Sequence, residues 1–152
     1  MDIQFRLAEK SDKDFLFKHI RAQQLNYPNY LKWVDKAMTE FEDGYKQAIL
    51  AFYEKVIVGN LLFQQHKENV NLLELKNMRI HPKVQRRYFG QFMIRQVEAE
   101  NRGGFSGIIC DIHSNRKDLF WMLLACGYKP LCDAPLYEPN ILETIMFKSL
   151  EK

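Results

Sequence analysis

A strand–helix–strand unit in the middle of the chain constrains the fold more than any other feature. A strand-like run over residues 70–80 stops at Pro82, apolar residues then recur with helical spacing over 89–97, and a second strand-like run covers 105–112. Such a crossover implies that the two strands are locally parallel. In sheets of this kind, ligands bind beside the carboxyl ends of the strands and the start of the following helix.

The rest of the chain supplies further strands and helices around this unit. Ser11 and Asp14 have the form of a capping box, which predicts the start of a helix. Alternation and helical spacing also predict a strand at 3–7, a helix at 31–41, hairpin strands at 48–53 and 56–63, a buried helix at 119–126 and, after a loop with two prolines, a final strand at 143–150. We therefore predict one domain over 1–152, of the α/β (α+β) class, with a single mixed, mostly antiparallel sheet of about six or seven strands and helices on both faces.

Composition limits the classes of partner. The hydrophobic fraction of 47% and the charged fraction of 27% are ordinary for a globular protein, and a net charge of +3 permits an anionic ligand without indicating nucleic acid. Cys110, Cys126 and Cys132 are odd in number and lack metal-site spacing, which favours reduced thiols. No segment has the form of a membrane span or a signal peptide. We expect a cytoplasmic protein without metal, nucleic-acid or membrane partners, and a homodimer stays open.

A basic segment precedes the helix of the central unit. Lys83, Arg86 and Arg87 lie just before the helix start, where the partial positive charge of the helix dipole already disfavours cations. The first backbone N–H groups of a helix are unpaired and attract anions. This placement indicates an anion site, and solvated surface charges remain the alternative interpretation.

The same segment resembles a phosphate-binding motif. Gln85-Arg86-Arg87-Tyr88-Phe89-Gly90 is similar, at its first and last positions, to the Q/R-x-x-G-x-G/A signature of the GNAT superfamily of acyl-CoA N-acyltransferases. The strand end Met78-Arg79-Ile80-His81-Pro82 resembles the family's approach to that loop. Tyr88 replaces the middle glycine and must adopt the backbone conformation that glycine usually takes.

The resemblance continues along nearly the whole chain in the family's order. Ile3 to Ala8, with Asp12 or Asp14 after it, resembles the opening segment, and Val56 to Asn60 resembles a conserved strand pattern. Asn115 to Tyr128 and the strand 143–150 resemble the closing segments, although Leu123 occupies the position of the family's frequent acid tyrosine.

The resemblance implies acetyl-CoA as cosubstrate and a primary amine of a small molecule or protein as acceptor. It assigns binding of coenzyme A to Met78, Arg79, Ile80, Gln85, Arg86, Arg87, Tyr88, Phe89, Gly90, Gln91 and Asn115. The acceptor site is expected between residues 11–43 and 131–140, where Tyr27, Tyr30, Trp33 and Tyr137 either line it or pack the core.

Three residues are candidates for proton transfer. Glu74 is predicted to share a strand face with Lys76, Met78 and Ile80, and would act as general base unless it is a surface glutamate. His113 ends the following strand and has a suitable pKa range, but a loop role is the alternative. Tyr128 is either a proton donor or part of the core.

Three functions remain open from the sequence. The first is an active N-acetyltransferase. The second is a module that binds acyl-CoA without turnover, favoured by Tyr88 and Leu123. The third, a basic nucleic-acid-binding domain, is supported only by the short basic segment around Arg86 and Arg87.

Overall fold

All seven strands of the computed structural model lie in one sheet, with the order β1-β2-β3-β4-β5-β7-β6. The structure describes residues 2–23, 28–100 and 104–151. Only β4 and β5 are parallel, and the other neighbours are antiparallel. The predicted mixed sheet and its parallel crossover are thus confirmed. The strands are β1 (Ile3–Leu7), β2 (Lys46–Tyr53), β3 (Val56–Gln65), β4 (Leu72–Ile80), β5 (Gly107–His113), β6 (Lys129–Glu138) and β7 (Ile141–Ser149).

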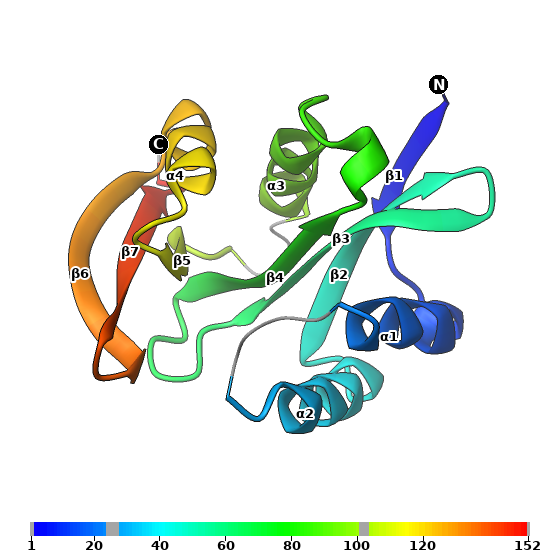
Figure 1. The fold of residues 1–152 in the computed structure, drawn as a ribbon, viewed down its shortest axis with the longest axis horizontal. Helices are drawn as coiled ribbons and strands as arrows, with labels where there is room; N and C mark the ends of the chain where they lie inside the picture. Colours follow the sequence, from blue (N-terminus) through cyan, green and yellow to red (C-terminus); the bar gives the residue numbers. More distant parts are fainter. Residues whose placement is uncertain (1, 24–27, 101–103, 152) are drawn as a thin grey trace.

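Helices cover both faces of the sheet, as predicted (Figure 1). On one face lie α1 (Lys13–Arg21) and α2 (Tyr30–Glu42), and on the other lie α3 (Phe89–Ala99) and α4 (Lys117–Ala125). Two short 3-10 helices, η1 (Lys10–Asp12) and η2 (Pro82–Val84), precede α1 and α3. The crossover through α3 joins β4 to β5.

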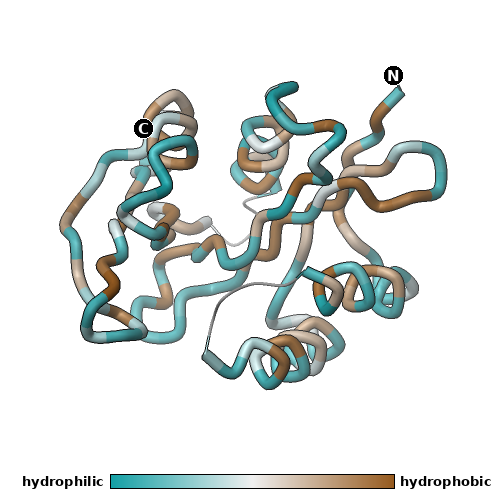
Figure 2. The backbone as a smooth tube through the Cα atoms, viewed as in Figure 1, coloured by the Kyte–Doolittle hydropathy of each residue, from teal (hydrophilic) through white to brown (hydrophobic). Residues whose placement is uncertain are grey.

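Each face of the sheet has its own hydrophobic core. Leu16, Phe17 and Val34 of α1 and α2 pack on Leu50 and Leu62. On the opposite face, Met93, Ile94 and Val97 of α3 pack with residues of β3, β4 and β5. Figure 2 shows hydrophobic segments along the central strands, whereas the helices alternate between hydrophobic and hydrophilic residues. The sheet therefore separates two hydrophobic cores, and an opening between two strands would connect its two faces.

A bulge in β4 changes which side chains share a face. Leu61 pairs with Met78, but Phe63 pairs with Leu75, so β4 has one more residue than β3 in this interval. Leu75 and Met78 consequently pack on the same core, on the α3 side. Glu74 does not share a face with Met78 and Ile80, and that prediction is wrong because the period of two is interrupted at the bulge.

The predicted loop before the last strand is instead the edge strand β6. It pairs only with β7, and its sequence includes Pro130 and Pro135. Proline lacks the N–H group needed for a ladder, but an edge strand leaves one side unpaired and tolerates it. Because of these prolines, the sequence pattern predicted a loop here instead of a strand.

Two predicted helices differ from the sequence interpretation in detail. The capping box lies at the start of η1, which precedes α1, and is formed by Glu9 and Asp12 instead of Ser11 and Asp14. Helix α4 is not buried all round, because Trp121 is 66% exposed. Arg6 donates two hydrogen bonds to Asp12, one to each carboxylate oxygen.

Candidate active site

A cleft opens between the two parallel strands of the sheet. Leu72 of β4 lies opposite Gly107 of β5, and the pairing continues to Glu74 opposite Ile109. Beyond this point the strands diverge and a cleft of about 280 Å³ lies between them, on the α3 and α4 side. We call it the donor cleft. Its wall includes Met78, Arg79, Ile94, His113 and Leu123.

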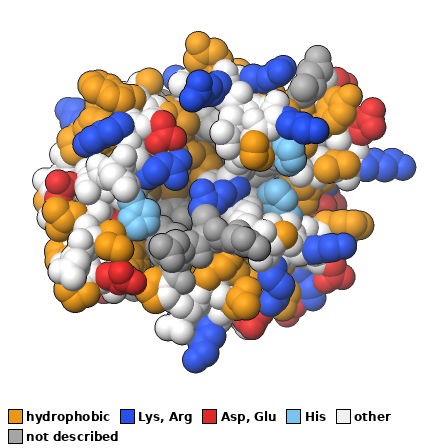
Figure 3. Space-filling model, viewed as in Figure 1, with side chains coloured by type: hydrophobic (Ala, Val, Ile, Leu, Met, Phe, Trp, Pro, Cys, Tyr) orange, Lys and Arg blue, Asp and Glu red, His pale blue; other side chains and the backbone are white. Residues whose placement is uncertain are grey.

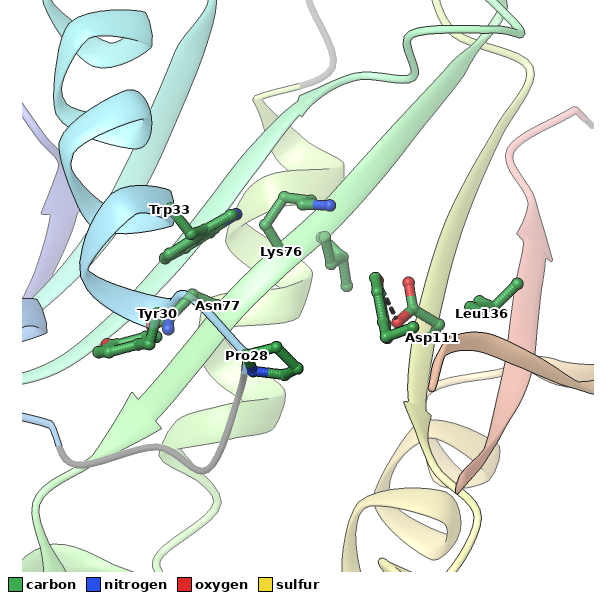
Figure 4. Close-up of a pocket in the computed structure, with 9 residues that line it drawn as sticks. Pro28, Tyr30, Trp33, Lys76, Asn77, Asp111 and Leu136 are labelled. Atoms are coloured by element: carbon green, nitrogen blue, oxygen red, sulfur yellow. Dashed lines mark hydrogen bonds between the residues drawn. The ribbon is translucent and has the colours of Figure 1, made fainter. Parts of the chain in front are cut away.

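A second cavity, of about 400 Å³, lies on the opposite face of the sheet. Tyr30 and Trp33 of α2 form one wall, and Leu136 of β6 lies across from them (Figure 4). Tyr137 of β6 also lines the cavity. The structure thus has a cavity between the two segments from which the sequence predicted the acceptor site. We call it the acceptor cavity. Tyr27, which was expected here, lies outside the described residues.

The two hollows share part of their walls. Leu75, Lys76, Asn77 and Asp111 line both of them. These residues lie on β4 and β5, where the bulge and the end of the ladder leave the strands apart. The arrangement allows two molecules to approach one point from opposite faces of the sheet.

Asp111 is the one acidic residue that lines both hollows among the described residues. The Tyr137 hydroxyl donates a 2.7 Å hydrogen bond to its Oδ2. A register irregularity in β6, where residues 135–137 stand opposite Leu142, accompanies this approach of Tyr137. Asp111 was not among the residues predicted from the sequence. The available signal was a carboxylate between Cys110 and Ile112 in an otherwise apolar strand.

The loop before α3 has an unusual backbone. Arg86 has φ of 62° and Tyr88 has φ of 66°, both in the left-handed region. The prediction that Tyr88 adopts a glycine-like conformation is confirmed. Its side chain is 70% exposed, so the ring points to solvent instead of filling the turn. Gln85 closes the base of the loop by donating a 3.0 Å hydrogen bond to the carbonyl of Ile80.

Gly90 allows α3 to begin close to α4 and β4. A Cβ atom at this position would lie 2.8 Å from the sulphur of Met122 and 3.4 Å from a methyl carbon of Ile80. Phe89 packs edge-on against Phe5. The start of α3 is therefore fixed by packing, while the first N–H groups have no partners within the helix.

Cations surround this helix start. Lys83, Arg86 and Arg87 are exposed, and no acidic side chain in the described ranges forms a salt bridge with them. Figure 3 shows Lys and Arg side chains interspersed with acidic and hydrophobic ones on the viewed face, instead of one continuous basic surface. The unpaired cations are thus available to a local anion.

Comparison with solved structures identifies the fold. The ribosomal-protein-S18-alanine N-acetyltransferase from Escherichia coli superposes with a TM-score of 0.79 at 13% identity, covering 99% of this chain and 96% of that chain. An acetyltransferase of the GNAT family from Staphylococcus aureus Mu50 gives 0.76 at 15% identity, covering 99% and 100%. The chain has the GNAT fold.

A third similar structure was solved with a bound ligand. YncA from Salmonella typhimurium, solved with its cofactor acetyl-CoA, gives a TM-score of 0.75 at 14% identity, covering 100% of this chain and 96% of that chain. No family model matches the sequence, and no curated protein sequence matches it. The similarity to GNAT structures therefore lies in the arrangement of the elements and not in close sequence identity.

Glu74, a candidate base from the sequence, lies on the α2 face of the GNAT sheet. Its carboxylate accepts a 3.2 Å hydrogen bond from Gln64 and lies 3.6 Å from the ammonium group of Lys76. Gln64 in turn accepts a hydrogen bond from Lys46. Glu74 lines neither hollow directly, but Lys76, its partner, lines both.

His113 lies in the wall of the donor cleft. Its Nδ1 atom is 3.0 Å from a carboxylate oxygen of Glu143, the residue opposite it on β7. Glu143 is 1% exposed, and burial raises its pKa while the neighbouring His113 lowers it. His113 thus brings an imidazole to the wall of the donor cleft.

The structure separates the remaining candidates from this site. Tyr128 is 1% exposed in the core and lines neither hollow, and burial raises the pKa of its hydroxyl far above the ordinary value. Asn115 is exposed and also lines neither, whereas the next residue, Arg116, lines the donor cleft. Leu123 supplies the donor cleft with an apolar wall at the position where the GNAT resemblance expects an acid tyrosine.

Residues 2–23, 28–100 and 104–151 contain no group of three His, Cys, Asp or Glu side chains placed to hold a metal ion. Within the same ranges, every helix is too short or too polar to cross a bilayer.

Proposed function

We propose that this chain is a GNAT-family N-acyltransferase, which transfers an acetyl or related acyl group from coenzyme A to a primary amine of a small molecule or protein. The observation that carries this proposal is the meeting of the donor cleft and the acceptor cavity at Asp111 and the bulge of β4. Two substrates that approach from opposite faces would have their reacting atoms at one point, and such proximity supplies much of the rate of a two-substrate reaction.

The donor side fits a coenzyme A thioester. The N–H groups at the start of α3, in the loop from Gln85 to Gln91, would bind the pyrophosphate, with Arg86 and Arg87 adding positive charge. The thiol-bearing arm would follow Met78 and Ile80 of β4 into the donor cleft, whose inner wall of Ile94 and Leu123 is apolar. When bound, the thioester supplies an activated acyl carbonyl.

Asp111 is our proposed general base. A primary amine is mostly protonated at neutral pH, with a pKa of roughly 10.4 for a lysine-like group, and must lose a proton before it attacks a carbonyl. The attack forms the amide N–C bond and breaks the C–S bond, so that coenzyme A leaves as a thiol. Asp111 lines both hollows and so lies nearer to the junction than Glu74, which remains the second candidate.

The departing sulphur needs little help from the protein. A thiol has a pKa of about 8.5, so a thiolate is a tolerable leaving group near neutral pH. The wall residue Leu123 offers no proton, whereas His113 in the donor cleft is able to return one. This supports turnover without a tyrosine acid.

A module that binds acyl-CoA without turnover is the second candidate. The apolar Leu123 in the donor cleft favours it. Both candidates predict binding of coenzyme A, and only the first predicts consumption of acetyl-CoA.

Two measurements test the proposal in sequence. Coenzyme A at 100 times its dissociation constant should stabilise the protein by about 2.7 kcal/mol, seen as a higher melting temperature. Release of free thiol from acetyl-CoA in the presence of primary amines should then exceed the rate without an amine. Thermal stabilisation without any amine-dependent thiol release would leave the binding module as the function, and no stabilisation would remove both candidates.

A further inference from the structure

We propose that the acceptor is a compact primary amine with one positive charge, attached to a flat apolar body and lacking a carboxylate. The inference rests on the proposed function and names the substrate class of the same site. It follows from the charges, the aromatic walls and the satisfied polar groups of the acceptor cavity.

The charges of the cavity favour a single cation. Asp111 is the acidic side chain among the described residues that line it, and Tyr137 binds only one of its two oxygens. The other cavity charge is Lys76, whose ammonium group is 3.6 Å from the carboxylate of Glu74 and is thereby offset. A second positive charge on the substrate would find no second carboxylate among the described residues of this wall. A carboxylate on the substrate would be repelled by Asp111.

The walls of the cavity favour a flat apolar body. The rings of Tyr30 and Trp33 are stacked, with centroids 6.0 Å apart and planes inclined by 17°. Leu136 lies across the cavity from them (Figure 4), and the neighbouring Tyr137 also lines it. Aromatic faces attract cations and pack flat groups, so an ammonium group held at Asp111 would have its carbon body between these walls.

Several polar groups of the cavity already have hydrogen-bond partners within the protein. The Tyr30 hydroxyl donates a 2.6 Å hydrogen bond to the carbonyl of Ile20. The side-chain oxygen of Asn77 accepts a 2.9 Å hydrogen bond from Asn60, and Tyr137 donates to Asp111. A substrate with many hydroxyl groups would find few free partners there, and its desolvation would weaken binding.

The size of the cavity agrees with a small molecule. A volume of about 400 Å³ lies near the lower end of ligand sites, which span roughly 300–1,000 Å³. An amine on a single ring is of suitable size.

The test uses the full chain with saturating acetyl-CoA and a matched amine panel, with amine-dependent thiol release as the readout. Phenethylamine is the probe. Butylamine lacks the ring, phenylalanine adds a carboxylate, and spermidine adds cations. We expect kcat/KM for phenethylamine to exceed that of each comparison amine by about tenfold or more, the size expected of one good aromatic contact or one avoided charge clash.

A variant connects the preference to the cavity wall. In Trp33→Leu, the ratio of kcat/KM between phenethylamine and butylamine should fall several-fold, with thermal stabilisation by coenzyme A as the check that the variant is folded. If that variant does not fold, the wild-type panel alone decides.

The outcomes separate this inference from the proposed function. A preference for spermidine, phenylalanine or butylamine, with acetyl-CoA consumed, overturns the acceptor class and leaves the acyltransferase intact. Binding of coenzyme A without consumption in the presence of any amine, N-terminal peptide amines included, overturns the function itself.

Discussion

At the scale of single residues, Asp111 is the proposed general base. Asp111→Asn keeps the size of the side chain and its hydrogen bond with Tyr137, but removes the negative charge that accepts a proton. We expect kcat/KM for the amine to fall by roughly 10²–10⁴-fold, the usual contribution of a general base. Affinity for coenzyme A, measured by thermal shift or calorimetry, should stay within a few-fold of wild type.

The matched comparison is Glu74→Gln, which changes a carboxylate on the same face that lines neither hollow. We expect a smaller loss, and a pH–rate profile of unchanged shape. If Glu74→Gln instead lowers turnover mainly above neutral pH while Asp111→Asn is nearly neutral, the base is Glu74.

Tyr88 allows a second prediction at the residue scale. Its left-handed backbone costs a non-glycine residue roughly 1–2 kcal/mol, and its exposed ring contributes little packing. Because glycine also loses more entropy on folding, Tyr88→Gly should be more stable than wild type by only about 0.5–1 kcal/mol. Tyr88→Ala removes the ring but keeps the strained Cβ, so it should not be stabilised. Urea unfolding of both variants checks this, and equal stabilities would show that the strain is negligible.

At the scale of elements, the contact between α3 and α4 fixes the end of the loop before α3. Gly90→Val places a branched side chain against Met122 and should destabilise by about 1–3 kcal/mol, as overpacking usually does. Gly90→Ala should cost much less, since only the flexible Met122 side chain must move. Combining Gly90→Val with Met122→Ala should restore at least ~0.5 kcal/mol relative to the sum of the single changes, measured by urea unfolding. Strict additivity would mean that the two side chains do not meet.

The elements also show what the sequence was able to predict. The crossover was predictable because the period of apolar residues changes twice between Leu72 and Gly107. The bulge in β4 was not, since Glu74 and Lys76 alternate with apolar residues as in a regular strand and only pairing with β3 exposes the extra residue. For the same reason the sequence did not predict Asp111, because only the position of β5 beside the bulge shows that its side chain lines both hollows.

At the scale of the whole molecule, the α2 face carries a buried charge that connects stability to pH. Lys46 is 2% exposed, and burial lowers its pKa to about 8. The ring of Trp33 lies 5.8 Å from its ammonium group. Two carboxylates, Glu40 of α2 and Glu74 of β4, raise the pKa of Lys46. Two amines, Lys76 of β4 and Lys67 of the loop before β4, lower it.

The lowered pKa sets the sign of the effect. Between about pH 8 and pH 10.5, the unfolded chain keeps a proton on Lys46 that the folded protein has released, so this group makes the free energy of unfolding rise with pH. Its burial penalty is complete below pH 8 and gone above pH 10.5, and amounts to about 3 kcal/mol. In Lys46→Met the penalty is absent at every pH. The difference in unfolding free energy between wild type and this variant should therefore move by about that amount in favour of wild type from pH 7 to pH 10, measured in urea.

Lys32→Met, on the exposed side of α2, is the control and should show no such change. A difference for Lys46→Met that stays constant across this range would mean that the buried amine is solvated well enough to keep its ordinary charge.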